Sequence, residues 1–365
     1  MSSNVTVNTE QAHETLTAII KAGLTGMLTG SPGIGKSDLV KHLAKVFNLK
    51  LIDVRLAQCD PTDLLGFPCV ADVPITYVGE DGEPVEATQK KASYVPMDTF
   101  PIKGDKLPVD DDGKEMEGWL IFLDEFNSAD RSVQKAAYKL VLDNMVGQMH
   151  LHDRVVKICA GNLDTDMAIV EDMSSALQSR LIHLELSLDS EAWLNWAAAA
   201  GIDHRVSSFI RFKPGNLSTF DPQRVAETKT YACPRTWEFA SKLLKQLDIK
   251  SSLALPILAG TLSEGVAREF LAFCRIYQDL PSLSEMLAAP DMLAVPTEPG
   301  TLFAVTGSIA QNATEDNVAK LIIYMNRFPM EFQVVCLREM GRRHNTLLKT
   351  PAVAGWVAAN NTELF

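Results

Sequence analysis

The chain has 365 residues, which is more than one ordinary hydrophobic core accommodates, so we expect two or three domains. Its composition, 46% hydrophobic and 22% charged, is typical of a folded globular protein and excludes a disordered chain. The formal net charge of −12 argues against a protein that coats nucleic acid over its whole surface.

The cysteines and the apolar runs indicate where the protein resides. The six cysteines are scattered without a CxxC pair, so neither a disulfide framework nor a zinc site is expected. The first ten residues, MSSNVTVNTE, lack the basic and apolar regions of a signal peptide. The apolar runs, such as WLIFL, are far shorter than a membrane span. We therefore expect a cytoplasmic protein without membrane insertion.

The first elements along the chain predict a βαβ unit. Residues 9–22 carry apolar side chains at helical spacing, with Thr9 as the expected N-cap. The apolar run LTGMLTG (24–30) predicts a buried strand that leads into a glycine-rich loop. A helical pattern over 37–48 and a strand pattern over 49–56 follow. Strand, loop, helix and strand in this order are typical of a parallel sheet.

Residues 66–118 interrupt this alternation, and we interpret them as an insertion carried on the core. Within the insertion, ITYVGEDGEPVEA predicts a hairpin around Gly79–Gly82. The acidic stretch VDDDGKEMEG (109–118) is interpreted as a solvated turn rather than a metal site.

The strand pattern resumes after the insertion. GWLIFLDE (118–125) predicts a buried strand that ends in two carboxylates, and a helix is expected at about 130–144. A short hairpin should come next, followed by a strand at 155–160. The segment SSALQSR (174–180) predicts a helix, and LIHLEL (181–186) a further strand.

After about residue 188 strand patterns nearly vanish and amphipathic helices follow one another. The proline-rich segment 288–300 is the expected linker among them. Late in the chain, REMGRRH (338–344) gathers three arginines, which we interpret as a solvated helical face.

The loop GSPGIGKS, residues 30–37, fits the pattern GxxxxGK[S/T] without a mismatch. Its glycines let backbone N–H groups converge on phosphate oxygens, and the following helix N-terminus favours an anion. Lys36 is expected to reach the β- and γ-phosphates, and Ser37 to hold Mg²⁺. The sequence thus predicts a site for ATP and Mg²⁺, formed by Gly30, Ser31, Pro32, Gly33, Ile34, Gly35, Lys36, Ser37 and Asp38.

Two carboxylates close the apolar strand of residues 118–125. Asp124 is expected to bind Mg²⁺ through water, and Glu125 to orient or deprotonate the attacking water. A strand that ends in acids is often only a solvated edge, so this interpretation depends on the phosphate loop being present.

Three further polar residues are candidates for catalysis. Asn162 ends a strand that should lie beside the strand of Glu125, where its amide could touch the γ-phosphate or the water; a plain Asx turn is the alternative. Arg180 sits between a helix and a strand, and an arginine reaching a neighbour's γ-phosphate would stabilise transition-state charge. A surface salt bridge is its alternative. Arg235 opens a helix, where a cation opposes the dipole, which favours a ligand-directed role.

These motifs resemble those of an AAA+ ATPase in their order along the chain. The resemblance gives Walker A at 30–37, Walker B at 120–125, sensor-1 Asn162, arginine-finger Arg180 and sensor-2 Arg235. The blocks GMLTGSPGIGKS, DPTDLLGF, GWLIFLDEFNSADRSVQKAAYKLVLDNMVG and CAGN are similar to those of the MoxR-type group.

The resemblance implies a P-loop α/β fold: an AAA+ parallel-sheet core followed by an all-helical C-terminal lid and a helical extension. We accordingly predict a nucleotide-binding core at 1–187, a lid at 188–290 and an extension at 291–365. It also implies a homo-oligomeric, hexameric ring with ATP between subunits, an insertion at about 66–118 and a hairpin at about 145–155.

Three functions remain open at this point. The first is a MoxR-like ATPase that remodels a protein client, with a von Willebrand A-domain protein as the partner that the resemblance suggests. The second is a nucleic-acid-associated motor or loader, which the charge of −12 disfavours. The third is an assembly scaffold, in which ATP binding builds a ring and slow hydrolysis dismantles it. A small-molecule kinase is disfavoured, because nothing in the insertion resembles an acceptor site.

Overall fold

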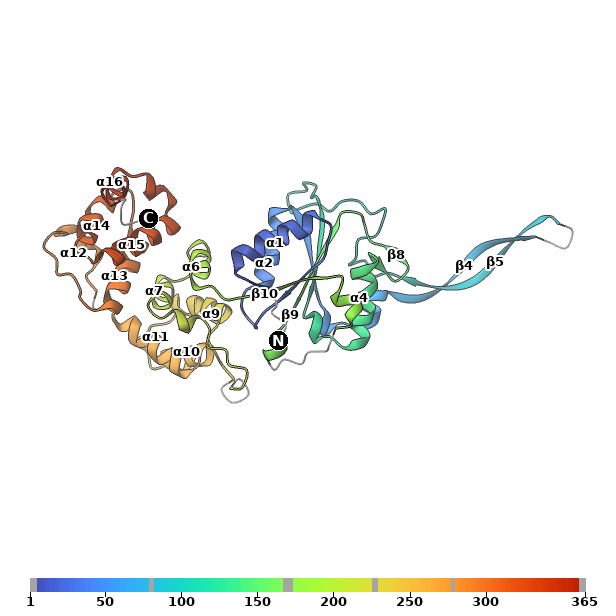
Figure 1. Ribbon diagram of the computed structural model, residues 1–365, viewed down its shortest axis with the longest axis horizontal. Coiled ribbons are helices and arrows are strands. Elements are labelled where there is room, and N and C mark those ends of the chain that lie inside the picture. The colour runs from blue at the N-terminus through green and yellow to red at the C-terminus, as the bar shows by residue number, and fades with distance from the viewer. Residues whose placement is uncertain (1–4, 79–81, 167–172, 225–228, 277–279, 361–365) are drawn as a thin grey trace. The chain divides into compact units, whose positions relative to one another are not determined.

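Figure 1 shows a computed structural model of the chain, which describes residues 5–78, 82–166, 173–224, 229–276 and 280–360. The chain divides into two units, Met1–Ser187 and Leu188–Phe365. No helix within the described ranges is long and apolar enough to cross a membrane.

The first unit is built on a six-stranded parallel sheet, in the order β1-β10-β2-β9-β6-β3. This confirms the predicted α/β fold with a parallel core. Because all strands run the same way, their carboxyl ends meet at one edge of the sheet. The strands are β1 Thr6–Val7, β2 Gly26–Thr29, β3 Leu49–Arg55, β6 Gly118–Asp124, β9 Val155–Gly161 and β10 Ile182–Leu186.

Helices cover both faces of this sheet (Figure 1). Helices α1 (Thr9–Lys21) and α2 (Lys36–Val46) share one hydrophobic cluster with Leu120 and Phe122 of β6. The intervening residues Ile121 and Leu123 belong to a second cluster on the other face, together with α4. The strand is apolar on both faces because both are buried, as expected for a parallel sheet. On that second face lie α3 Pro61–Leu65, α4 Arg131–Leu142 and α5 Ser175–Gln178.

The N-cap of the first helix lies one residue earlier than predicted. Asn8, not Thr9, is the N-cap, so that prediction was wrong. The Asn8 side chain accepts a hydrogen bond from the Gln11 backbone N–H at 2.9 Å, and the Gln11 side chain accepts one from the Asn8 N–H at 3.1 Å. This reciprocal capping box needs a Gln or Glu three residues after the cap, a spacing that Asn8 satisfies and Thr9 does not.

The insertion forms a long antiparallel ribbon of β4 (Phe67–Val78) and β5 (Pro84–Val95). The predicted hairpin is confirmed and is longer than expected; residues 79–81 of its predicted turn lie outside the described residues. Gly66 begins the ribbon with φ +86°, and a Cβ there would lie 2.1 Å from the Val95 carbonyl oxygen. Only glycine fits this crossing of the two ends. In Figure 1 the ribbon projects away from the sheet.

A second, shorter hairpin joins α4 to β9, as predicted. Its strands are β7 (Met145–Val146) and β8 (Met149–His150). Asn144, just before β7, has φ +53°, a left-handed conformation that asparagine tolerates better than most residues.

In the described part of the second unit, the regular secondary structure is helical, and loops connect the helices. One hydrophobic cluster gathers around Phe209, Trp237 and Phe270, and another around Tyr324 and Trp356. Helix α13 contacts both α7 and α15, so it joins the two clusters. The division near residue 290 stays a prediction. The helices are α6 Ser190–Ala199, α7 His204–Phe212, α9 Pro234–Leu244, α10 Ala254–Leu262, α11 Glu264–Ile276, α12 Leu283–Ala288, α13 Pro299–Asn312, α14 Val318–Met325, α15 Met330–Arg343 and α16 Pro351–Ala359.

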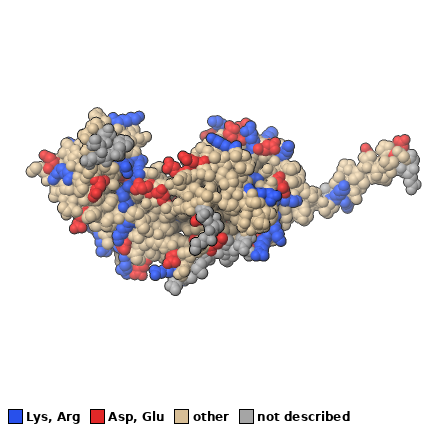
Figure 2. Space-filling model, in the orientation of Figure 1, with Lys and Arg blue, Asp and Glu red and all other residues tan. Residues whose placement is uncertain are grey.

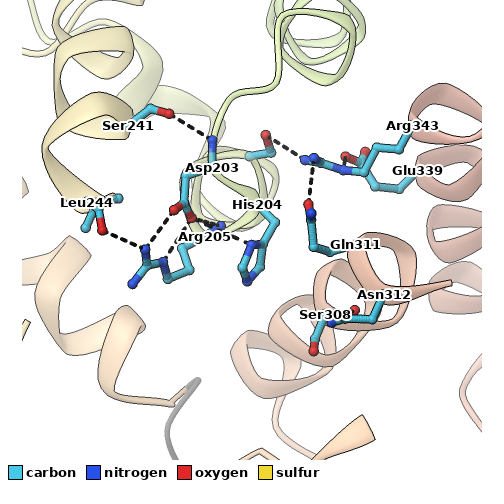
Figure 3. Close-up of polar contacts among 11 residues, drawn as sticks. Asp203, His204, Arg205, Ser241, Leu244, Ser308, Gln311, Asn312, Glu339 and Arg343 are labelled. Carbon is cyan, nitrogen blue, oxygen red and sulfur yellow. Dashed lines mark hydrogen bonds and ion pairs between the residues drawn. The ribbon is translucent and has the colours of Figure 1, made fainter. Parts of the chain in front are cut away.

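In the arginine cluster late in the chain, Arg338 is exposed as predicted, but Arg342 and Arg343 are partly buried in ion pairs, which corrects the prediction for these two. Glu339 is buried, and its carboxylate pairs with Arg211 at 2.8 Å and with Arg343 at 2.9 Å. Arg343 also donates to Gln311 Oε1 at 3.0 Å and to Ser207 Oγ at 3.4 Å (Figure 3). A buried carboxylate requires such cationic partners, and these draw the arginines inward.

Charged side chains of both signs are scattered over the visible surface, most of which belongs to other residues (Figure 2). On the face drawn in Figure 2, lysine and arginine are interspersed with aspartate and glutamate. The β4–β5 ribbon carries the same mixture, since Asp72 lies opposite Lys90 in its register. Acidic and basic side chains are therefore not segregated into two separate regions of this face.

Candidate nucleotide-binding site

Three segments with predicted site residues end at the carboxyl edge of the sheet. Strand β2 leads into the glycine-rich loop, β6 ends at Asp124, and β9 is followed by Asn162. Strand β9 lies between β2 and β6, with Thr29 paired to Gly161 and Leu123 paired to Cys159. The prediction that the strand of Asn162 lies beside the strand of Glu125 is confirmed.

The loop of residues 30–35 wraps the amino end of α2. Gly33 and Gly35 have φ +76° and +109°, in the left-handed region that favours glycine. Pro32 precedes Gly33, and Ile34 lies between the two glycines. Asp38, one turn further, is exposed and pairs with Lys41 at 3.8 Å on the outer side of the helix.

Lys36 is buried at the start of α2 with 8% of its surface exposed. Its ammonium group donates to the carbonyl oxygens of Gly30 and of Ser31, the latter at 3.2 Å. It also donates to Asn162 Oδ1 at 3.4 Å. Three oxygens thus accept hydrogen bonds from the Lys36 ammonium group, which the sequence analysis predicts to bind phosphate.

Ser37 and Asp124 meet where the sequence predicts a metal ion. The Ser37 hydroxyl donates to Asp124 Oδ2 at 3.1 Å. A hydroxyl and a carboxylate are the hard oxygen ligands that Mg²⁺ prefers. Glu125 follows with φ +56°, and its backbone N–H donates to Asp124 Oδ1 at 2.9 Å. A left-handed glutamate is uncommon, so the chain turns sharply away from the strand direction at this residue.

Asn127 is a site residue that the sequence analysis missed. It is 3% exposed, and its side chain makes two hydrogen bonds to the backbone of Asn162. Asn127 Nδ2 donates to the Asn162 carbonyl at 2.8 Å, and Asn127 Oδ1 accepts from the Asn162 N–H at 3.1 Å. A Cβ at Gly161 would lie 2.3 Å from the same Oδ1, so glycine is required there. The only signal in the sequence is a polar residue two positions after the Asp-Glu pair, separated from it by Phe126.

Asp166 is the second residue that was missed. It is 9% exposed and accepts a hydrogen bond from the Ser31 hydroxyl at 3.2 Å and one from the Leu163 N–H at 3.4 Å. Burial raises the pKa of this carboxyl, against the opposing effects of Ser31, Leu163 and Lys36. Its sequence context, NLDTD, does not distinguish it from the exposed Asp164.

Of the two candidate arginines, Arg180 does not join this cluster within the first unit. Arg180 is exposed, lies between α5 and β10, and donates to the Ala176 carbonyl of its own helix at 2.8 Å. Because Ile182 pairs with Gly26, Arg180 precedes the amino ends of these strands, whereas the loop follows the carboxyl end of β2. Arg235 belongs to the second unit, where it is exposed on the first turn of α9.

The residues at the carboxyl edge fit ATP and Mg²⁺. The loop ends at a helix N-terminus, whose free N–H groups and dipole favour phosphate. Lys36 already satisfies its charge with oxygen acceptors, which phosphate oxygens can replace. The oxygens of Ser37 and Asp124 supply the donor set for a hard cation.

Comparison with known proteins identifies the domain. Residues 26–181 match the family described as "AAA domain (dynein-related subfamily)", so the first unit contains an AAA domain, and AAA domains bind ATP. This match bears out the broad resemblance to AAA+ proteins, whereas the finer one to the MoxR-type group stays a prediction. No curated protein matches the sequence.

Among solved structures, the chain is similar to a Cytophaga hutchinsonii protein provisionally described as an ATPase. The sequences are 15% identical, and the match covers 98% of this chain and 90% of that one. The TM-score is 0.34, which is too low to support an argument on fold or function. The family match and the geometry carry the interpretation.

Proposed function

We propose that this chain, whose residues 26–181 form an AAA domain, is a MoxR-like ATPase. It hydrolyses ATP at the interfaces of a hexameric ring and uses the energy to remodel or assemble a protein client. One observation supports this most strongly. Lys36, Ser37, Asp124 and Asn162 are linked by hydrogen bonds at one edge of the sheet, and Arg180 is exposed toward the other edge.

The residues at the carboxyl edge take separate roles in hydrolysis. Bound Mg²⁺ and ATP supply a γ-phosphoryl group whose developing charge the metal partly neutralises. Lys36 would exchange its carbonyl partners for phosphate oxygens, and Ser37 and Asp124 would hold the metal. Glu125 orients the attacking water and takes its proton, and Asn162 positions the water or the γ-phosphate. The contacts at the start of α2 and at the ends of β6 and β9 support this proposed division of roles.

Arg180 acts on the nucleotide of a neighbouring subunit. In the register of β10 with β2, Arg180 lies six residues before the level of Gly30, roughly 20 Å along the strand direction at 3.3 Å per residue. That separation supports action between subunits, because the side chain would have to span it to reach its own loop. An arginine supplied in this way stabilises charge that develops in the transition state.

The two hairpins and the second unit supply the link to the client. Exposed apolar side chains, among them Val70 and Val78, lie along the β4–β5 ribbon. We assign the ribbon and the β7–β8 hairpin to client contact, and Arg235 to sensing the nucleotide. A von Willebrand A-domain protein is the partner proposed to deliver the client.

Capture by a hydrolysis-deficient variant tests this function. Glu125→Gln should still bind ATP, because the loop and Lys36 are intact, and should hold its client when loaded with ATP in native lysate. Lys36→Ala, which should not bind ATP, is the control. Mass spectrometry that finds one protein client or an A-domain protein only with Glu125→Gln supports the proposal. Nuclease-sensitive material without protein would replace it with the nucleic-acid motor, and full cellular function of Glu125→Gln with the scaffold.

A further inference from the structure

Ser31, the second residue of the phosphate loop, is held from two sides. Its carbonyl oxygen accepts a hydrogen bond from Lys36 at 3.2 Å, and its hydroxyl donates to Asp166 at 3.2 Å. Asp166 follows β9 in a short 3₁₀ turn and lies 135 positions away in the sequence. The loop is therefore tied to a separate element of the same sheet edge.

Lys36 is directed at the loop itself in this arrangement. Its ammonium group contacts the carbonyls of Gly30 and Ser31, and the charge is further balanced by the nearby Asp166 carboxylate. A phosphate can accept hydrogen bonds from the Lys36 ammonium group in place of these carbonyls only after the carbonyl contacts break. Any group that fixes Ser31 in place therefore stabilises the state in which Lys36 is engaged with the loop.

Asp166 is well placed to provide that fixation. It is buried, and its second oxygen is anchored by the Leu163 N–H at 3.4 Å, so the carboxylate cannot readily follow Ser31 if the loop moves. Glu185, whose charge also acts on Asp166, adds negative charge at this edge. Lys36 is near enough to act on the Asp166 charge, but Asp166 takes its hydrogen bonds from Ser31 and Leu163, so the carboxylate holds the loop through Ser31.

We infer that Asp166 is a positioning residue that latches the phosphate loop through Ser31 and so weakens nucleotide binding. This inference rests on the proposed function, since it presumes that the loop binds nucleotide. The latch stabilises the ligand-free loop, and nucleotide must open it before Lys36 can turn to phosphate. Apparent affinity is then reduced by the fraction of molecules in the latched state.

The test compares nucleotide affinity in four chains: wild type, Asp166→Ala, Ser31→Ala and the double variant. Dissociation constants for ADP with Mg²⁺ are measured by titration calorimetry, and association rates by stopped flow with a fluorescent ADP analogue. Each single variant should bind about fivefold more tightly, the change that one ordinary hydrogen bond produces. The gain should lie mainly in the association rate, because the latch must open before binding.

A matched control separates the latch from a general charge effect. Asp164→Ala removes an equal charge from the same turn, where the side chain is exposed, and should leave affinity unchanged. Asp166→Ala should change affinity by less than twofold in the Ser31→Ala background, because the two residues act as a pair. If Asp166→Ala fails to fold, Ser31→Ala alone must still tighten binding.

The outcomes are distinct. Tighter binding by the single variants without additivity supports the latch. Unchanged or weaker binding, or additive effects, overturns it, even if the variants melt at a lower temperature. A wild-type chain that binds no nucleotide would instead overturn the proposed function.

Discussion

The two edges of the parallel sheet differ in how completely their polar residues are paired. At the carboxyl edge, Lys36, Asp124 and Asn162 are linked by hydrogen bonds to one another's segments. At the amino edge, Arg180 is exposed and donates a hydrogen bond to the Ala176 carbonyl of the preceding helix. One edge joins its polar residues within the chain, whereas the other presents an exposed cation. This difference supports the proposal that a second copy completes the site.

Removing the Lys36 side chain should produce the largest change, a loss of nucleotide affinity at the carboxyl edge. Lys36→Ala should weaken ADP binding about a hundredfold, because charge-assisted hydrogen bonds worth about 3 kcal/mol are lost. Lys41→Ala is the control, since Lys41 lies on the same helix but pairs on its outer side with Asp38. Titration calorimetry measures both. Wild-type affinity in Lys36→Ala would mean that the paired edge is not a nucleotide site.

Removing Asn127 tests whether the pairing at the carboxyl edge positions Asn162. Asn127→Ala breaks two buried hydrogen bonds to the Asn162 backbone. We expect kcat for ATP to fall about tenfold while KM changes less than twofold, because a displaced Asn162 loses transition-state contacts worth about 1.4 kcal/mol. Ser128→Ala, in the same turn, should behave as wild type. A change in KM alone would assign Asn127 to ground-state binding.

Lys157 lies in β9 between the two edges, and its substitution tests stability rather than nucleotide binding. Its ammonium group caps α4 by donating to the carbonyls of Leu140 at 3.2 Å and Val141 at 2.9 Å, and it also contacts Asn144. Burial lowers the pKa of Lys157 from 10.5 to about 8. Between these values the unfolded chain binds more protons than the folded one, so this group makes stability rise with pH.

The measurement is the free energy of unfolding in urea at pH 8 and at pH 10.5. The wild-type value minus that of Lys157→Met should increase by at most about 3 kcal/mol over this range. The subtraction removes the contribution of the other titrating groups. A difference that stays constant or falls with pH would show that Lys157 is not held in a desolvated environment.

The sequence predicted the parts of the site that depend on motif spacing and on strand direction. A glycine-rich loop after one parallel strand and carboxylates after another must share an edge, and this brings Ser37 to Asp124. Contacts between distant segments were not predictable. Asn127 and Asn162 lie 35 positions apart, and Ser31 and Asp166 lie 135 apart, so their pairing depends on register and burial.

Outside the site, the same limit explains the errors. From the sequence, Arg343 belongs to a solvated cluster. In the fold, Glu339 is buried and pairs both with Arg343 and with Arg211, which lies 128 positions from Glu339. The sequence pattern underestimated the length of the β4–β5 ribbon, because charged and proline residues interrupt the apolar alternation that predicts a strand. Local pattern predicted the elements, whereas side-chain burial required the tertiary structure.

The most direct test of the central claim is a mixing experiment with Arg180→Ala and Lys36→Ala. Each variant alone should lose ATPase activity, the first for lack of the cation and the second for lack of nucleotide. Arg154→Ala, an exposed arginine before β9 at the same edge, should remain active. A co-expressed equimolar mixture should recover about a quarter of wild-type turnover, the share of interfaces that pair an intact loop with an intact arginine when subunits mix randomly. Full activity of Arg180→Ala alone, or an inactive mixture in which cross-linking shows mixed oligomers, would contradict the account.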